Sequence, residues 1–460
     1  MIKLFRHHVS FGSLLILGAD SILLLAVVPL AVLMQGKDWP LIGAVLPALV
    51  FASLMLALNS ALGLYRREST GRFGQHLGRV LLAVALGIPV AYMLFSVTPH
   101  GYEARGALGY AVLITLCGLI LLRQVVFWAS SAGVGARRVL IVGTGTEALG
   151  VEKALGTLGY PSLSIVGFYP AGPAGEAAVV ANDRILPSTL PLSELVRGLG
   201  IKEVVVAVRE QRGGVLPLTE LIECRVSGVP VTDLAGIYER VRGEVPLESL
   251  KASWLIYGQG FEQGGLRTFV KRTFDIAVSA ALLVLALPVM IVTALAVRLD
   301  SPGPVIYRQE RVGRGGRIFT CLKFRSMRAD AEQDGVPRWA LKSDPRVTRI
   351  GSFIRKSRID ELPQLLNVIK GEMSLVGPRP ERPEFVNELK RTISYYDLRH
   401  SVKPGVTGWA QVRYSYGASV EDARKKLQFD LYYVKNHSLF LDLLVLVETV
   451  RVVLFREGAQ

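Results

Sequence analysis

Four long apolar runs occupy the first quarter of the chain. They cover residues 13–35, 41–65, 80–97 and 107–128. Each is about long enough to cross the roughly 30 Å hydrocarbon core of a bilayer as a helix. No small-residue cleavage site follows the first run and three more runs come after it, so a cleaved signal peptide is not expected. We predict a four-helix transmembrane bundle over residues 1–130.

Basic residues are unevenly placed around these runs. Lysines and arginines precede the first run, separate the second from the third, and follow the fourth, whereas the other two loops hold only Lys37 and Arg105. This bias predicts that both ends of the bundle, and the chain after it, face the cytoplasm. The net charge of +15 comes without any nucleic-acid-binding motif. We therefore expect a lipid bilayer and a phosphorylated substrate as partners, and no nucleic acid.

Residues 131–262 read as an α/β domain. An apolar strand leads into Gly143, Gly145 and Ala148, which fit the G-x-G-x-x-A turn of dinucleotide-binding folds. Further strands at 164–170, 203–208 and 229–234 alternate with helical segments. This order predicts a Rossmann-like, doubly wound parallel sheet. No acid follows the second strand to bind ribose hydroxyls, so we expect the glycine turn to be structural and NAD not to bind.

Residues 263–460 begin with a fifth apolar run, 276–297, which has basic residues on both flanks. Pro288 lies near its middle and removes a helical hydrogen bond. We expect a re-entrant helix that breaks at Pro288 and returns to the same side of the membrane; an ordinary kinked span is the alternative. From about residue 298 onward, the sequence predicts a compact, mostly helical domain on the membrane surface, with residues 440–454 in the membrane interface.

Two adjacent acids, Asp360 and Glu361, precede a helical pattern that Gly371 ends. Asp360 is expected at or near the helix N-cap, where the simplest role is capping. Capping needs one acid only, and neighbouring helical residues point about 100° apart. The pair is therefore suited to separate roles around a metal or a phosphate, with the helix N-terminus keeping Asp360 ionised.

Several cations can complete a phosphate site. The candidates are Lys323, Arg325, Arg311 and Arg379. Arg379 is the strongest, because the prolines on both sides fix its backbone, and arginine binds phosphate through two hydrogen bonds.

The segments "KFRSM", "DPRVTRIGSFIRKSRIDELPQLLNVIKGEMSLVGPRP" and "VKPGVTGWAQV" resemble the bacterial sugar transferases, the monotopic phosphoglycosyl transferases. The resemblance runs from about residue 268 to the C-terminus. The preceding bundle and sheet resemble the long form of that family, and "RPERPEF" and "YSYGAS" resemble its exopolysaccharide-locus branch.

The resemblance implies a reaction in the bacterial inner membrane. A UDP-sugar, with glucose or galactose expected, gives its sugar 1-phosphate to undecaprenyl phosphate and releases UMP, as the first membrane step of exopolysaccharide, capsule or O-antigen assembly. It makes Asp360 the nucleophile and Glu361 its partner in holding Mg²⁺, and it places Lys323 and Arg379 at phosphate. A homodimer is a further expectation. Two departures stand out: Leu287 and Arg358 occupy positions where many members have serine or another small hydroxyl residue.

Two other function classes stay open. A membrane sensor or transporter would use the bundle, where Asp20 is an acid within a span. Because Asp20 and Arg123 both lie near the cytoplasmic ends of their spans, we expect an ion pair between them instead. A nicotinamide-dependent sugar-modifying enzyme would use the sheet.

Overall fold

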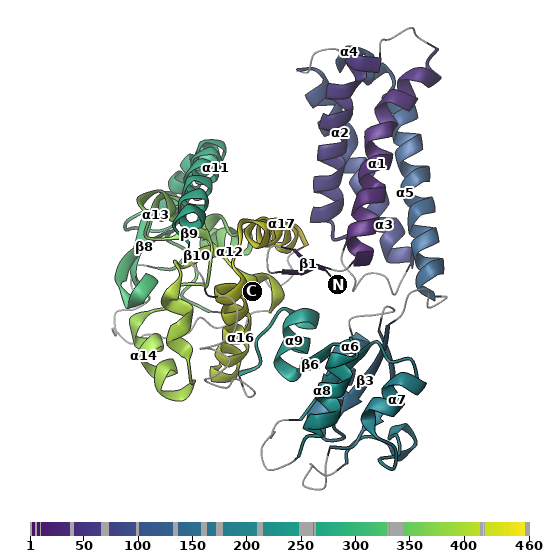
Figure 1. The fold of residues 1–460 in the computed structure, drawn as a ribbon. Coiled ribbons are helices and arrows are strands. Elements are labelled where there is room, and N and C mark those ends of the chain that lie inside the picture. The colour runs from purple at the N-terminus through teal and green to yellow at the C-terminus, as the bar shows by residue number, and fades with distance from the viewer. Residues whose placement is uncertain are drawn as a thin grey trace. The chain divides into compact units, whose positions relative to one another are not determined.

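The structure is a computed structural model (Figure 1). It describes residues 2–4, 7–9, 11–36, 41–65, 73–97, 101–131, 137–157, 163–171, 178–208, 215–247, 261, 264–328, 331, 344–414, 417 and 419–455. Apart from the first few residues, the chain divides into two compact units, His8–Gly243 and Glu244–Gln460. Most of the expected linker, 254–265, lies outside the described residues.

The first unit begins, after a short pair of strands, with five helices. The strands are β1 (Ile2–Leu4) and β2 (His7–Val9), and the helices are α1 (Phe11–Met34), α2 (Leu41–Ala61), α3 (Phe73–Phe95), α4 (Gly101–Gly106) and α5 (Leu108–Ser131). Helix α1 packs against α2 and α5, and α3 packs against the same two helices. Four of the five helices are therefore the expected apolar runs.

The boundaries differ from the prediction in two places. Helix α3 begins at Phe73, two turns before the apolar run. The apolar pattern did not predict these two turns because they contain polar residues. The short helix α4 was expected to be a loop. Its Ala104 is buried and its Arg105 lies over the ring of Tyr92, 5.3 Å from the centroid. In the part of the chain that is described, five helices are long and apolar enough to cross a membrane: α1, α2, α3, α5 and α11.

The rest of the first unit is a parallel sheet of four strands in the order β4-β3-β5-β6. Its elements are β3 (Arg137–Val142), α6 (Thr146–Thr157), β4 (Leu163–Tyr169), η2 (Asn182–Arg184), α7 (Leu192–Gly198), β5 (Glu203–Val206), α8 (Leu218–Val226), β6 (Val231–Asp233) and α9 (Leu234–Arg242). The four strands lie where the sequence predicted them.

The central strand β3 is buried on both faces. Val139 and Ile141 pack into one core with α6 and α9, whereas Leu140 and Val142 pack into a second core with α7 and α8. Gly143 ends the strand with φ 124°, and a Cβ there would lie 2.6 Å from the carbonyl oxygen of Ala207. Close backbone packing thus accounts for this glycine without a bound nucleotide.

The second unit is mostly helical, as predicted, with one unforeseen hairpin. Its helices are α11 (Gly265–Asp300), η4 (Arg314–Gly316), α12 (Arg349–Lys356), η5 (Ile359–Glu361), α13 (Gln364–Lys370), α14 (Pro383–Thr392), η6 (Tyr396–Ser401), α15 (Trp409–Arg413), α16 (Val420–Asn436) and α17 (Leu439–Phe455). Its strands are β7 (Ile306–Val312), β8 (Ile318–Phe324), β9 (Ser374–Val376) and β10 (Gly405–Thr407). Strands β7 and β8 form the antiparallel hairpin, and β9 pairs with β10 in parallel.

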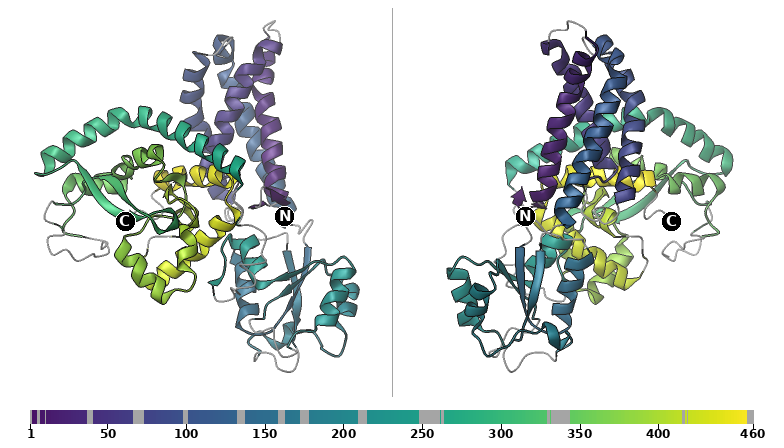
Figure 2. Two further views of the ribbon diagram at one scale, coloured as in Figure 1. Left: turned by 60° about the vertical axis from the view of Figure 1, so that its left-hand side comes forward. Right: turned by 90° about the vertical axis from the view of Figure 1, so that its right-hand side faces the viewer.

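Helix α11 is continuous through Pro288 over its 36 residues. The predicted break at Pro288 is therefore wrong, and Figure 2 shows a curved, unbroken helix instead. A proline inside an apolar helix can be accommodated by bending and local adjustment of the freed backbone groups. Helices α1, α2 and α3 also contain internal prolines.

Aromatic packing holds the core of the second unit. Trp409 of α15 stacks on Tyr432 of α16 with ring centroids 5.8 Å apart, and both are buried. Tyr433 donates one hydrogen bond to the carbonyl of Val376 in β9, at 2.9 Å, and lies 2.7 Å from Asp442 of α17. Helices α16 and α17 thereby fix β9, and β9 leads directly to Arg379.

Candidate functional site

The adjacent acids lie in a different local structure from the one predicted. Asp360 and Glu361 form the 3-10 turn η5, and α13 begins only at Gln364 with Pro363 as its N-cap. The expectation that Asp360 caps an α-helix is therefore wrong, because Pro363 delays the start of the helix. The predicted C-terminus is confirmed, since Gly371 ends α13 in a left-handed conformation.

Glu361 is surrounded by cations. Its Oε1 accepts a hydrogen bond from Arg379 at 2.7 Å and one from Lys323 at 3.2 Å, and the Arg358 guanidinium is 3.9 Å away. Burial alone would raise the pKa of Glu361, but these three cations hold that pKa well below its usual range. Glu361 is therefore an anion at neutral pH that fixes Arg379 and Lys323.

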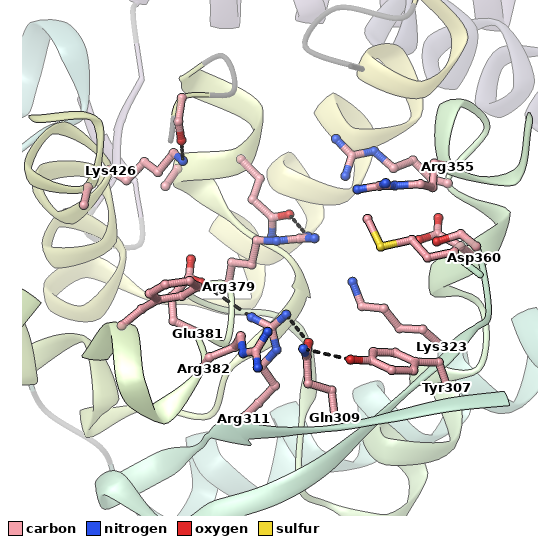
Figure 3. A pocket seen from close by; sticks show the side chains of 18 of the residues that line it. Tyr307, Gln309, Arg311, Lys323, Arg355, Asp360, Arg379, Glu381, Arg382 and Lys426 are labelled. Atoms are coloured by element: carbon pink, nitrogen blue, oxygen red, sulfur yellow. Dashed lines mark hydrogen bonds and ion pairs between the residues drawn. The ribbon is translucent and has the colours of Figure 1, made fainter. Parts of the chain in front are cut away.

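Asp360 has the opposite character. Burial, together with the neighbouring Glu361 charge, raises the pKa of its carboxyl, although Lys323 and Arg379 oppose the shift. Its Oδ1 is buried and has no hydrogen-bond partner among the described residues. Figure 3 shows Asp360 at one side of a cavity, between Arg355 and Lys323. The site thus contains one carboxylate with bound partners and one that faces the cavity without them.

Arg379 is held in place by its backbone. Gly377 and Gly405 meet where the loop after β9 crosses β10, and a Cβ at Gly405 would lie 2.1 Å from the Gly377 nitrogen. Arg399 donates a hydrogen bond to the Arg379 carbonyl at 2.9 Å, and the Arg379 side chain reaches Gln411 as well as Glu361. The predicted rigidity of Arg379 is thus present, with glycine close packing and Arg399 in addition to the flanking prolines.

Two of the other predicted cations are engaged by the protein. Arg325 donates to the carbonyls of Pro302, Val297 and Ser301 at 2.9, 3.3 and 2.6 Å and is buried. It therefore caps the C-terminus of α11. Because Arg325 also lines the cavity, its role in phosphate binding stays a prediction. Arg311 lines the cavity from β7 while donating to the carbonyl of Pro380 at 3.0 Å.

The cavity has a volume of about 420 Å³ and a strongly basic lining. Eleven of the residues that line it are lysine or arginine, and three are acidic. Asp360 and Lys323 lie on one side of it, and Lys426 on the other (Figure 3). The size suits a nucleotide-sized ligand, and the excess of cations favours a polyanion such as a pyrophosphate.

Four positioning residues were not predicted. Arg399 and Asp430 form a buried ion pair at 2.8 Å behind Arg379, and Gln411 contacts Arg379 directly. Asn367 is fully buried and bonds to Thr320, Leu322 and Glu372, which fastens α13 to β8. The only sequence signal for Asn367 was its position on the polar face of the predicted helix.

The carboxylates suit Mg²⁺ only in company with a phosphorylated ligand. Among the described residues no group of three His, Cys, Asp or Glu side chains is placed to hold a metal. Asp360 Oδ1 is nevertheless buried and unpartnered, with Glu361 adjacent. Mg²⁺ characteristically takes one or two carboxylates and completes its shell with substrate phosphates and water, so the residues fit an ion of that kind.

The ion pair predicted in the first unit is present. Arg123 of α5 donates to both carboxylate oxygens of Asp20 in α1, at 3.1 and 2.6 Å, and Tyr65 donates to Oδ2 at 2.9 Å. Both charged side chains are buried. A pair of this kind joins two helices and gives each oxygen of Asp20 a partner within the protein, which favours a structural role over transport.

Comparison with known proteins identifies the second unit. The family described as Bacterial sugar transferase matches residues 266–456. The UDP-N-acetylgalactosamine-undecaprenyl-phosphate N-acetylgalactosaminephosphotransferase of Aeromonas hydrophila is 44% identical over 240 residues, 52% of this chain and 56% of that protein. The UDP-glucose:undecaprenyl-phosphate glucose-1-phosphate transferase of Escherichia coli is 44% identical over 188 residues, 40% of each chain.

One similarity extends beyond the second unit. The UDP-glucose:undecaprenyl-phosphate glucose-1-phosphate transferase of Xanthomonas campestris pv. campestris is 32% identical over 372 residues, 77% of this chain and 75% of that protein. For the Aeromonas and Escherichia proteins, the match spans about half the relative's length or less. Of the three function classes left open by the sequence, these similarities favour the sugar-phosphate transferase.

Proposed function

This chain belongs to the bacterial sugar transferase family, and we propose that it transfers a sugar 1-phosphate from a UDP-sugar to undecaprenyl phosphate, releasing UMP, through a covalent intermediate on Asp360. Relatives named for N-acetylgalactosamine, glucose and galactose make those three UDP-sugars the donors to test. Two further points stay predictions: a role in exopolysaccharide, capsule or O-antigen assembly, and a homodimeric state.

The observation that carries the proposal is the unequal state of the two acids. Glu361 is neutralised by Arg379 and Lys323, whereas Asp360 lines the cavity with a buried Oδ1 that has no partner in the described part of the chain. A carboxylate that serves only structure would have its oxygens hydrogen-bonded, because an unpaired buried polar atom destabilises the fold. Asp360 therefore lacks the partners of a purely structural carboxylate, and it lines the cavity in which a nucleophile would meet its substrate.

In the first half-reaction, an Asp360 carboxylate oxygen attacks the sugar-bearing phosphorus of the donor. The bond between that phosphorus and the bridging oxygen breaks, and the oxygen leaves with its electron pair as part of UMP. Lys323 and Arg379, held by Glu361, stabilise the negative charge that spreads over the phosphoryl and leaving oxygens.

In the second half-reaction, a phosphate oxygen of undecaprenyl phosphate attacks the same phosphorus. The aspartyl–phosphorus bond breaks and returns Asp360 as a carboxylate, leaving the sugar on a lipid diphosphate. A Mg²⁺ ion held by Asp360 and Glu361 together with substrate phosphates would supply further charge neutralisation. An acceptor that is already ionised needs no general base.

The ends of α11 support a location on one membrane surface. Near its start, Arg272 donates to the carbonyls of Val368 and Ile369 at 2.6 and 2.7 Å. Near its end, Arg325 donates to the Val297 carbonyl of α11 at 3.3 Å, and Asp300 accepts from the Ile350 nitrogen at 3.3 Å. Both ends thus pack on one compact unit, whereas the helix, at about 54 Å, is far longer than one hydrocarbon core.

Residues between these ends expose apolar side chains, with Val284 and Leu285 more than 70% exposed. We therefore infer that α11 dips into one leaflet, bends, and returns to the cytoplasmic face. Single cysteines replacing Lys271 and Asp300 should both react with an impermeant thiol reagent from the cytoplasmic side only. Reaction of either one from the opposite side would make α11 a true span.

The activity is tested with purified membranes or detergent-solubilised full-length protein. UDP-glucose, UDP-galactose and UDP-N-acetylgalactosamine are supplied with and without undecaprenyl phosphate, and UMP is measured. We expect one donor to give sustained UMP release with the lipid and about one equivalent per site without it, with a matching mass increase on the intact protein. Release that requires both substrates, with no adduct, would exclude the covalent route.

A further inference from the structure

Arg358 has a backbone conformation that arginine rarely adopts. It follows the C-cap of α12 with φ 60° and ψ 12°, in the left-handed region. Among the described residues, Phe261, Arg358 and Tyr395 are the only non-glycine residues with positive φ. Glycine or asparagine is the usual choice at this position after a helix. The chain therefore places arginine at a position where the backbone alone would favour glycine.

The side chain of Arg358 contributes to the cavity that contains Asp360. It lines the cavity and lies 3.9 Å from Glu361 Oε1. Within the described part of the chain its guanidinium makes no hydrogen bond, unlike Arg325, Arg379 and Arg399, which each donate to at least two acceptors. Arg358 thus retains donors that a ligand in the cavity can use.

The charges around Asp360 do not balance without a ligand. Lys323, Arg355 and Arg379 line the cavity together with Arg358, and the acids described near these four cations are Asp360, Glu361 and Glu381. Positive charge is therefore in excess beside Asp360, which favours a phosphate group there. Arginine is well suited to such a group because its planar fork binds phosphate oxygens through paired hydrogen bonds.

We propose that Arg358 is a phosphate-binding residue of the transfer site, retained in a strained backbone position so that its guanidinium reaches the phosphoryl group beside Asp360. This inference rests on the proposed function. The phosphate belongs either to the UDP-sugar donor or to the lipid acceptor, and these offer the same chemistry to a guanidinium. The two half-reactions distinguish them.

Three substitutions separate charge from backbone strain. Arg358→Gly removes both the charge and the strain, Arg358→Gln removes the charge alone, and Arg358→Lys keeps the charge without the fork. Lys356→Gln is the matched control, because Lys356 is an exposed cation two residues away that does not line the cavity. Each full-length variant is assayed for UMP burst against UDP-sugar concentration, for steady-state turnover against undecaprenyl phosphate concentration, and for melting temperature.

Arg358→Gly and Arg358→Gln should raise one KM by roughly tenfold to a hundredfold, the range expected for losing a charged hydrogen bond. Arg358→Lys should recover part of that loss, and Lys356→Gln should match the parent. Only Arg358→Gly should raise the melting temperature, by about 2 °C. A changed donor concentration dependence of the burst assigns the donor phosphate, and a change confined to the acceptor KM assigns the lipid phosphate.

The opposite results overturn the inference. Parent-like KM values for both substrates in Arg358→Gln would remove Arg358 from phosphate binding, even if Arg358→Gly were unstable or inactive. A KM raised by Arg358→Gly but not by Arg358→Gln would assign the effect to the backbone. If the parent protein itself released no UMP from any donor, the proposed function would fail first, and binding of inorganic pyrophosphate to the parent and Arg358→Gln proteins would still test the cation.

Discussion

Buried carboxylates occur in both units, and they differ in how many hydrogen-bond partners the protein gives them. Asp20 in the first unit has a partner on each oxygen, with Arg123 bound in a bidentate manner and Tyr65 added. Asp360 in the second unit has a buried oxygen without a partner among the residues that the structure describes, although four cationic side chains line the cavity nearby. In the first arrangement the protein supplies a partner for each carboxylate oxygen, whereas the second leaves one oxygen for a ligand.

This difference separates a structural ion pair from a reaction site. A pair within apolar helices is stable only if each charge is matched, because an unmatched charge is poorly solvated there. A site that binds a polyanion must instead keep excess positive charge and one reactive oxygen available. Substitutions in the first region should therefore change stability, and those in the second should change catalysis more than stability.

The largest effect is expected for Asp360→Asn. The amide keeps the size of the side chain but cannot attack phosphorus, so turnover should fall by at least roughly 10³-fold and no sugar phosphate should remain on the protein. Because the pKa of Asp360 is raised by burial, its carboxylate destabilises the fold at neutral pH, and the variant should melt at the same or a higher temperature. Intact mass spectrometry and thermal unfolding measure both; an adduct in the variant would remove Asp360 from the nucleophilic role.

A large stability effect is expected for the Asp20–Arg123 pair. Removing either partner alone leaves one buried charge, at a loss of about 3–5 kcal/mol, whereas Asp20→Asn combined with Arg123→Gln should lose much less. The measurement is a double-mutant cycle on unfolding in detergent. Additive single effects would show that the two residues do not depend on each other, and an unchanged UMP burst in the double variant is the control for activity.

Glu361→Gln should lose about 2 kcal/mol of stability, since Arg379 and Lys323 lose a charged hydrogen-bond partner. The lowered pKa of Glu361 means that its stabilising contribution is fully present above the ordinary glutamate pKa and is lost as the pH falls towards the folded-state pKa. The stability difference between parent and variant should therefore shrink in acid. Chemical unfolding at several pH values measures it, and a difference independent of pH would contradict the assignment.

Much of the fold could be predicted because apolar periodicity and turn residues act locally. The four membrane runs, the strands of the parallel sheet, the end of α13 at Gly371 and the Asp20–Arg123 pair all follow from residue type and position. The hairpin β7–β8 was missed because charged residues interrupt the apolar pattern of β7, and because its pairing is a long-range property.

The site was predictable in its residues but not in its electrostatics. The adjacency of Asp360 and Glu361 was visible, yet the start of α13 depended on how Pro363 is placed, and the raised pKa depends on burial by distant segments. Arg325 and Lys323 lie two residues apart in one motif, and only the fold shows that the first binds the end of α11 and the second binds Glu361. Arg399 and Asp430 carried no local signal.

The rate of adduct formation should fall in acid, by about tenfold for each pH unit below the pKa of Asp360. Since that pKa is raised, protonation should remove the nucleophile at a pH above the ordinary aspartate value of about 3.9. A single-turnover UMP burst at a series of pH values measures the profile. Circular dichroism over the same range is the control for folding, and a burst rate that stayed flat down to about pH 4 would contradict the raised pKa.

The smallest effect is expected for Arg325→Lys. This substitution tests whether Arg325 serves to bind backbone carbonyls or to bind the substrate. Lysine keeps the charge but cannot bind the carbonyls of Val297, Pro302 and Ser301 together, so stability should fall by about 1 kcal/mol. The KM for the UDP-sugar should stay within about twofold of the parent value, because the guanidinium is directed at the end of α11. Lys323→Gln is the matched comparison and should raise that KM, since its ammonium lies beside Asp360 at the cavity wall (Figure 3). A raised KM with unchanged melting in Arg325→Lys would return Arg325 to the phosphate site, and equal KM values in both variants would show that neither cation meets the donor.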